Sequence, residues 1–132
     1  MSTLESTLRY LKVPVRAGLR GLDSGVVGTL ADKLSVDEPV VLKLASIGAR
    51  TYQRRKSDRT PLTETEADRL LRVARIAQEA ERVFGDAGKA RGWLTKPSAV
   101  LGGAAPLALL GTDAGARDVE AELTRIEWGD FA

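Results

Sequence analysis

Hydrophobic residues recur at helical spacing along most of the chain, beginning close to its N-terminus. A short amphipathic helix is predicted for residues 3–11, where leucines fall at i, i+4 and i+7 (Leu4, Leu8 and Leu11). This helix should stop before Pro14 and lie at the periphery of the fold. The apolar residues of segment 17–34 predict one or two further short helices, weakened by glycine and broken near Asp23 and Ser24.

Two short helical segments with a glycine between them come next. Asp37 is placed to cap the first segment, and Pro39 suits its first turn, where no amide hydrogen is needed. The apolar side of this segment consists of Val40, Val41, Leu44 and Ala45. Ile47 and Gly48 interrupt the pattern, and a second helix is predicted from Arg50. Two short helices joined by a glycine-containing turn of this kind are typical of the helix-turn-helix.

The strongest pattern lies between Thr63 and Gly85. Thr63 and Glu66 have the spacing of a capping box, in which each side chain satisfies a backbone amide at a helix start. A long helix is predicted from there to Phe84, and Gly85 stands where a left-handed residue ends a helix. Its apolar stripe consists of Ala67, Leu70, Leu71, Ala74, Ala77, Ala80, Val83 and Phe84. On the solvated side we expect two ion pairs at i, i+4, namely Asp68 with Arg72 and Arg75 with Glu79.

The remaining residues predict short helices joined by compact connectors. One helix covers residues 86–94, another covers 106–110, and a last one begins after Thr112 or Asp113. The last helix has a narrow apolar seam, suited to packing on one neighbour, made of Ala116, Val119, Leu123 and Ile126. The predicted fold class is therefore all-α.

The composition removes several classes of chemistry. The 132 residues include no cysteine and no histidine, so a disulfide, a common zinc site and a side chain that titrates near neutral pH are all missing. The sequence has no glycine-flanked serine elbow and no Walker-type loop. It has no apolar stretch of about 18 residues and no secretory signal pattern. We expect a cytoplasmic protein that is no enzyme and has no cofactor, no metal and no membrane partner.

Charge divides the chain into two unlike halves. Residues 1–60 carry 11 Lys and Arg against 6 Asp and Glu, whereas residues 61–132 carry 9 against 12. A basic segment attracts polyanions through counterion release, and an acidic one suits a basic protein surface. The two halves are therefore expected to face different partners.

The second helix of the predicted helix-turn-helix carries the candidate DNA-binding residues. Its side chains can donate to base edges or phosphates, and Thr51 and Tyr52 can hydrogen-bond phosphate oxygens. The candidates are Arg50, Thr51, Gln53, Arg54, Arg55 and Lys56. A simpler interpretation is that this basic run is a solvated helix end that complements the helix dipole.

Two large aromatic residues stand in the last five positions, Trp128 and Phe131. One interpretation is that they fold back onto the core of their own chain. The other is capture by a partner, because aromatic anchors with acidic neighbours suit a cationic pocket on another protein. The candidate partner-binding residues are Glu127, Trp128, Gly129, Asp130, Phe131 and Ala132.

Several of these motifs, taken in order, resemble the Xre/MbcA/ParS type of antitoxin from about Asp37 onward. The residues that carry the resemblance are Arg50-Thr51-x-x-Arg54-Arg55, Leu62-Thr63-x-x-Glu66-x-Asp68-Arg69-Leu70-Leu71-Arg72, Val83-Phe84-Gly85-Asp86, Ala90-Arg91-x-Trp93-Leu94, Leu101-Gly102-Gly103-x-x-Pro106-Leu107-x-Leu109-Leu110-x-Thr112-x-x-Gly115-Ala116-x-x-Val119 and Leu123-x-Arg125-Ile126-Glu127-x-Gly129. The chain departs from the family pattern at Tyr52-Gln53 and at Lys96-Pro97-Ser98.

The resemblance implies a Cro-like helix-turn-helix region within residues 1–60 and a small helical toxin-binding domain within 61–132, joined by the long helix. It also implies a RES-domain toxin as partner, one that consumes NAD or transfers ADP-ribose. Such antitoxins cover the toxin's active site with their C-terminal end, here residues 128–132, and many repress their own operon. The NAD would belong to the toxin. The positions of Trp93, Leu94, Leu101, Pro106 and Leu110 are interpreted as scaffold.

Two other functions stay open at this point. A free-standing transcription repressor, whose C-terminal half only forms a homodimer, would use the same helix-turn-helix and operator DNA but would have no need for exposed aromatics at the chain end. A carboxylate-based enzyme would use the acidic last helix, but its carboxylates (Asp118, Glu120, Glu122 and Glu127) are better explained as a solvated or interfacial face.

Overall fold

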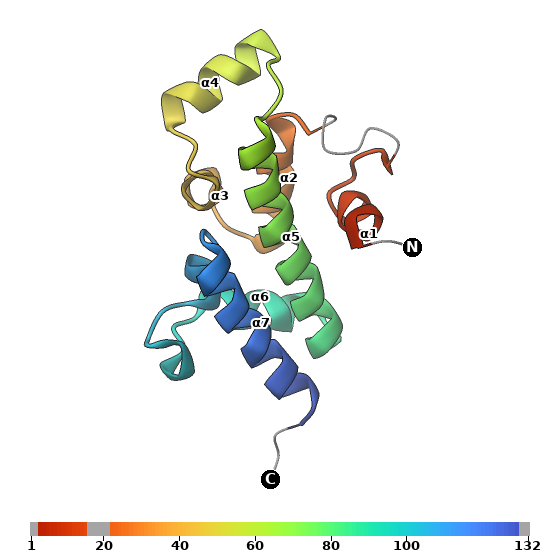
Figure 1. Ribbon diagram of the computed structural model, residues 1–132, viewed down its shortest axis with the longest axis vertical. Coiled ribbons are helices and arrows are strands. Elements are labelled where there is room, and N and C mark those ends of the chain that lie inside the picture. Colours follow the sequence, from red (N-terminus) through yellow and green to blue (C-terminus); the bar gives the residue numbers. More distant parts are fainter. Residues whose placement is uncertain (1–2, 16–21, 130–132) are drawn as a thin grey trace.

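A computed structural model describes residues 3–15 and 22–129 of the chain, and all regular elements in these ranges are helical (Figure 1). They are α1 (Thr3–Tyr10), α2 (Gly25–Leu34), α3 (Glu38–Ala45), α4 (Ala49–Asp58), α5 (Glu64–Phe84), α6 (Ala87–Thr95), the 3₁₀ turns η2 (Ala99–Leu101) and η3 (Pro106–Leu109), and α7 (Asp113–Glu127). The all-α fold class predicted from the sequence is confirmed.

Helix α5 is the central element, and the other helices assemble around it. It packs against α1, α2, α3, α6 and α7 (Figure 1). The predicted capping box is present, since the Thr63 side chain accepts from the Glu66 amide while the Glu66 carboxylate accepts from the Thr63 amide. Gly85 ends the helix with a φ of 69°, a left-handed conformation that favours glycine.

Helix α1 is better anchored than the expected peripheral position implied. Leu8 and Leu11 are only 1% and 2% exposed, and α1 packs directly on α5. Gln78 of α5 donates to the Ser6 hydroxyl at 2.7 Å, which adds a polar tie between the two helices. The expected peripheral position was wrong because leucines at i and i+3 share one helix face, and α1 packs with α5.

The short helices of the N-terminal half begin and end largely as predicted. Ser24 precedes α2 and is buried, at the break expected near Asp23 and Ser24, while part of the preceding segment lies outside the described residues. Asp37 does occupy the residue before α3, but its side chain makes no capping hydrogen bond. Ser46 ends α3 in the left-handed conformation, with a φ of 57°.

In the C-terminal half, side-chain caps begin both main helices. The Asp86 carboxylate accepts from the Lys89 amide at 2.7 Å at the start of α6. The Thr112 hydroxyl accepts from the Gly115 amide at 3.1 Å at the start of α7, so Thr112 is the cap and Asp113 is the first helical residue. The seam expected on α7 faces inward, with Ala116, Val119 and Leu123 buried and Ile126 half-buried.

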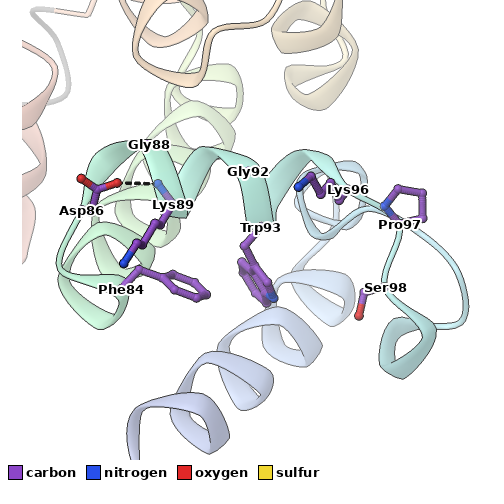
Figure 2. A pocket seen from close by; sticks show the side chains of 9 residues that line it. All are labelled: Phe84, Asp86, Gly88, Lys89, Gly92, Trp93, Lys96, Pro97 and Ser98. Atoms are coloured by element: carbon purple, nitrogen blue, oxygen red, sulfur yellow. Dashed lines mark hydrogen bonds between the residues drawn. The ribbon is translucent and has the colours of Figure 1, made fainter.

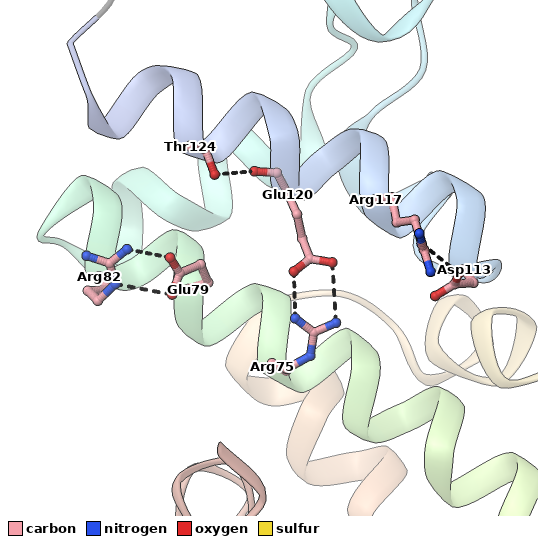
Figure 3. Close-up of polar contacts among 7 residues, drawn as sticks. All are labelled: Arg75, Glu79, Arg82, Asp113, Arg117, Glu120 and Thr124. Atoms are coloured by element: carbon pink, nitrogen blue, oxygen red, sulfur yellow. Dashed lines mark hydrogen bonds and ion pairs between the residues drawn. The ribbon is translucent and has the colours of Figure 1, made fainter. Parts of the chain in front are cut away.

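The two ion pairs expected along α5 are absent from the ion pairs of the described residues, and their arginines contact other elements instead. The Arg72 Nε donates to the carbonyl of Leu110 at 3.2 Å, and Arg75 pairs with Glu120 of α7 (Figure 3). Glu79 pairs instead with Arg82. The prediction was wrong because α7 and the turn before it offer Arg72 and Arg75 acceptors that the spacing along α5 does not reveal.

Helix α5 contributes to both halves of the molecule, so the proposed division into residues 1–60 and 61–132 stays a prediction. Within the described ranges, no single helix is long and apolar enough to cross a membrane. One pair of segments, Ala99–Leu109 with Asp113–Glu127, meets that length and composition criterion only jointly and is bent by 119°.

Candidate functional site

Helices α3 and α4, joined by residues 46–48, form the helix-turn-helix predicted from the sequence. Ile47 is buried in the turn, and its amide donates to the Leu42 carbonyl at 2.9 Å. Gly48 is extended (φ −71°, ψ 150°) and precedes the first residue of α4. The Arg69 guanidinium of α5 donates to the Ala45 carbonyl at 3.2 Å, which ties the end of α3 to the central helix.

Helix α4 presents most of its polar side chains to solvent. Arg50, Gln53, Arg54 and Lys56 are exposed, and Thr51 is half-buried. The helix has no acidic residue in its first turn and carries Arg55 and Lys56 in its last turn. The exposed cations and the amide of Gln53 are the donor types that read base edges and phosphates. The structure thus brings four of the six candidate DNA-binding residues together on one accessible helix.

Tyr52 is an exception to the predicted phosphate contacts. Its side chain is only 3% exposed, so it belongs to the core. Burial, together with a hydrogen bond to the Glu38 carboxylate of α3, raises the pKa of Tyr52 to about 12. Lys56 lies over the Tyr52 ring at 4.9 Å from its centroid. The hydroxyl is therefore used inside the helix-turn-helix and is not presented to a phosphate.

Arg55, one of the six candidate DNA-binding residues, is half-buried and directed toward another helix. Its guanidinium pairs with Glu66, and the two side chains are only 14% and 12% exposed. Burial of Glu66 opposes its ionisation, but hydrogen bonds from the Thr63 amide and from Arg55 outweigh that effect and hold the pKa of Glu66 below its ordinary value. One carboxylate therefore serves both the cap of α5 and a residue of α4.

The candidate partner-binding residues lie at the end of α7. Trp128 follows the helix directly and is 79% exposed, and Gly129 after it has a φ of 62°. Glu127 pairs with Arg82 of α5, and this contact lowers the pKa of Glu127. Asp130, Phe131 and Ala132 lie outside the described residues. The described part of this segment thus presents one large aromatic ring to solvent beside a paired carboxylate.

A surface hollow of about 740 Å³ lies where α5 ends and α6 begins (Figure 2). Phe84 and Trp93 form its aromatic wall, with ring centroids 5.6 Å apart and a tilt of 45°. Lys89 and Lys96 add positive charge to its lining. Trp93 was interpreted as scaffold, and it does pack partly buried against the core. The sequence pattern gave no sign of the hollow, because its walls come from two helices and the loop after α6.

Acidic side chains do not assemble into a metal site anywhere in the described ranges, where no group of three or more possible ligands occurs. Most acidic residues of α7 are instead paired with arginines. Glu120 pairs with Arg75, Glu122 with Arg125, and Asp113 with Arg117. Their arrangement supports a structural role for most of the carboxylates on this helix.

A helix-turn-helix joined through one long helix to a small helical unit is the architecture of a DNA-binding adaptor that carries a second binding domain. Two family comparisons agree with this description. Residues 13–75 match the Antitoxin Xre-like helix-turn-helix domain, and residues 79–129 match the Antitoxin Xre/MbcA/ParS C-terminal toxin-binding domain. The chain belongs to the Xre/MbcA/ParS family of antitoxins.

Individual relatives carry related names. An Antitoxin Xre of Photorhabdus laumondii is 34% identical over 113 residues, which cover 82% of this chain and 76% of the relative. An Antitoxin Xre of Pseudomonas putida is 45% identical over 83 residues, covering 63% of this chain and about half (52%) of the relative's length. A protein of Sphingobium named Prs ADP-ribosylating antitoxin is 28% identical over 108 residues, 75% of this chain and 68% of the relative.

Proposed function

We propose that this chain is the antitoxin of a two-protein system and neutralises a RES-domain toxin that consumes NAD or transfers ADP-ribose. In this proposal residues 127–132 cover the toxin's active site, and α4 binds operator DNA so that the pair regulates its own operon. The chain itself carries out no catalysis and needs no cofactor, because the NAD belongs to the toxin.

The exposed ring of Trp128 is the observation that carries the toxin-binding part. A tryptophan that is 79% exposed leaves a large apolar surface in water, and tryptophan is one of the residue types enriched at protein interfaces. The ring follows directly on α7, within the residues matched to the toxin-binding domain family. The words "ADP-ribosylating antitoxin" in the name of the Sphingobium relative support a system in which ADP-ribose is transferred.

The DNA-binding part is supported by the exposed polar side chains of α4 and by the match of residues 13–75 to an Xre-like helix-turn-helix. Arg50, Gln53, Arg54 and Lys56 would contact bases and phosphates, and Thr51 would contact a phosphate at the helix start. A homodimer would bind two half-sites, so a symmetric operator is expected, and a footprint over a single half-site would contradict it.

Co-expression with a RES-domain toxin from the same operon, if the neighbouring gene encodes one, tests the proposal. A chain that stops at Glu127 should fail to protect cells from the toxin, and Trp128→Ala should protect them less well than the unaltered chain. Arg117→Ala is the matched control, because Arg117 lies on the same helix and is highly exposed (77%) but far from its end. Full protection by the shortened chain would refute the proposed role of residues 128–132. A failure of the unaltered chain to protect cells would favour a free-standing repressor instead.

A further inference from the structure

Helix α4 is weakly packed for an element that is proposed to read DNA. It lies at one end of the molecule, beyond the helices gathered around α5 (Figure 1). Tyr52 is its one buried residue. A helix with so little buried apolar surface gains little orientation from hydrophobic packing, so specific polar contacts must contribute to its position.

Two of its side chains reach carboxylates on other helices. Tyr52 hydrogen-bonds Glu38 at the start of α3, and Arg55 pairs with Glu66 in the first turn of α5. These two side chains lie three positions apart, so they share one face of α4. That face is turned toward the body of the protein, which directs the exposed Arg50 and Arg54 elsewhere on the helix surface.

One oxygen of Glu66 serves both Arg55 and the start of α5. Glu66 Oε1 accepts from the Thr63 amide at 2.9 Å and also accepts from Arg55. The Thr63 hydroxyl in turn accepts from the Glu66 amide at 3.2 Å. The carboxylate is thus held by the helix start itself, and a fixed acceptor in a largely buried place orients its partner more strongly than an exposed one does.

We infer that Arg55 is a positioning residue, which sets the orientation of α4 on the operator by binding the capping carboxylate Glu66 and does not itself contact DNA. The inference rests on the proposed operator binding and refines it. In this inference two neighbouring arginines of α4 have different roles. Arg54 is exposed and is proposed to contact DNA, whereas Arg55 is directed inward toward Glu66. Arg55 then acts on DNA only through the helix that it holds.

Because Glu66 is negatively charged, the inference predicts the direction in which its replacement changes operator affinity. Removing a negative charge beside a DNA-binding helix should strengthen binding if only long-range electrostatics matter. Glu66→Gln should instead weaken operator binding by about tenfold, the effect of losing a charge-assisted hydrogen bond. Glutamine keeps the capping box, because Gln also serves at that position. Glu64→Gln is the matched control, since Glu64 is exposed in the same first turn of α5.

Operator affinity would be measured across a salt series for the full chain and its variants. Glu66→Gln should bind less tightly and Glu64→Gln as tightly as or more tightly than the unaltered protein. Arg55→Ala should bind about tenfold less tightly with an unchanged salt slope, Arg55→Lys should recover part of the loss, and adding Glu66→Gln to Arg55→Ala should cause no further loss. Tighter binding by Glu66→Gln, or a flattened salt slope in Arg55→Ala, would overturn the inference.

Amide hydrogen exchange provides a second measurement that does not involve DNA. Glu66→Gln should speed exchange in α4 while leaving α7 unchanged, and Glu64→Gln should change neither. If the unaltered protein bound no operator, the proposed DNA binding would fail, yet faster exchange in α4 would still support the link between Arg55 and Glu66. Unchanged exchange in α4 would refute that link whatever the DNA result.

Discussion

Arg75 of α5 and Glu120 of α7 face each other across the interface between the two helices (Figure 3). Nη1 of Arg75 lies 2.7 Å from Oε2 of Glu120, and Nη2 lies 3.4 Å from Oε1, so both nitrogens of the fork meet the carboxylate. Their side chains are 37% and 38% exposed. This pair joins the matched toxin-binding region to the central helix from outside the core.

The pairing predicts a measurable but small coupling between these two residues. A double-mutant cycle with Arg75→Ala and Glu120→Gln should give a coupling of about 0.2–1 kcal/mol in urea unfolding, because solvent screens a pair that is one-third exposed. The same cycle with Glu79→Gln should give a coupling near zero, since Glu79 pairs with Arg82. A larger coupling of Arg75 to Glu79 than to Glu120 would contradict the observed geometry.

Most helix boundaries could be predicted from the sequence because they are encoded locally. Thr63 and Glu66 lie three residues apart, and Gly85 immediately follows the last apolar position of α5, so the signals for both helix ends are contained in a few neighbouring residues. The same holds for the turn at Gly48. These predictions needed no knowledge of which helices touch.

The roles of individual polar residues could not be predicted, because they depend on partners far away in the sequence. Arg75 was expected to pair with Glu79 on its own helix and pairs with Glu120 instead. Arg55 and Tyr52 belong to the basic run of α4 by position, yet both are turned toward carboxylates of other helices. The spacing along one helix reveals which side chains share a face, but not which helix covers that face.

Arg54 is expected to contact a phosphate or a base. Arg54→Ala should weaken operator binding by about 1–3 kcal/mol and reduce the steepness of the salt dependence by about one charge. Binding assays at several salt concentrations would measure both quantities. Arg117→Ala removes the same charge from α7 and serves as the control. An equal effect of the two substitutions would show that net charge, and not a contact by Arg54, determines the affinity.

The lowered pKa of Glu66 predicts how the stability of the protein depends on pH. A carboxylate whose pKa is lower in the folded state stabilises the fold above its ordinary pKa, 4.5, and this contribution is lost as the pH falls through the lower folded value. Glu66→Gln should therefore reduce the free energy of unfolding at pH 7 by about 1 kcal/mol. In urea unfolding the difference from the unaltered protein should shrink toward pH 3. A difference that stays constant between those pH values would contradict the assignment.

Gly115, in the first turn of α7, should not tolerate a side chain. A Cβ placed there would lie 2.1 Å from the carbonyl oxygen of Leu109, and backbone at that distance cannot move aside as a flexible side chain can. Gly115→Ala should therefore lower the free energy of unfolding by about 2–3 kcal/mol. Gly92 is the matched control, because it lies inside α6 and a Cβ there would meet no atom within 4 Å.

The control should change stability in the opposite direction, because alanine is the better helix former. Gly92→Ala should raise the free energy of unfolding by about 0.5–1 kcal/mol. Gly115→Ala should also weaken toxin binding, since the clash separates η3 from α7 within the region matched to the toxin-binding domain family. Operator binding should persist at temperatures where the variant stays folded, because α4 is distant in sequence from Gly115 and lies beyond α3 at one end of the molecule (Figure 1). If Gly115→Ala proved as stable as Gly92→Ala, the close approach of Leu109 to α7 would be wrong.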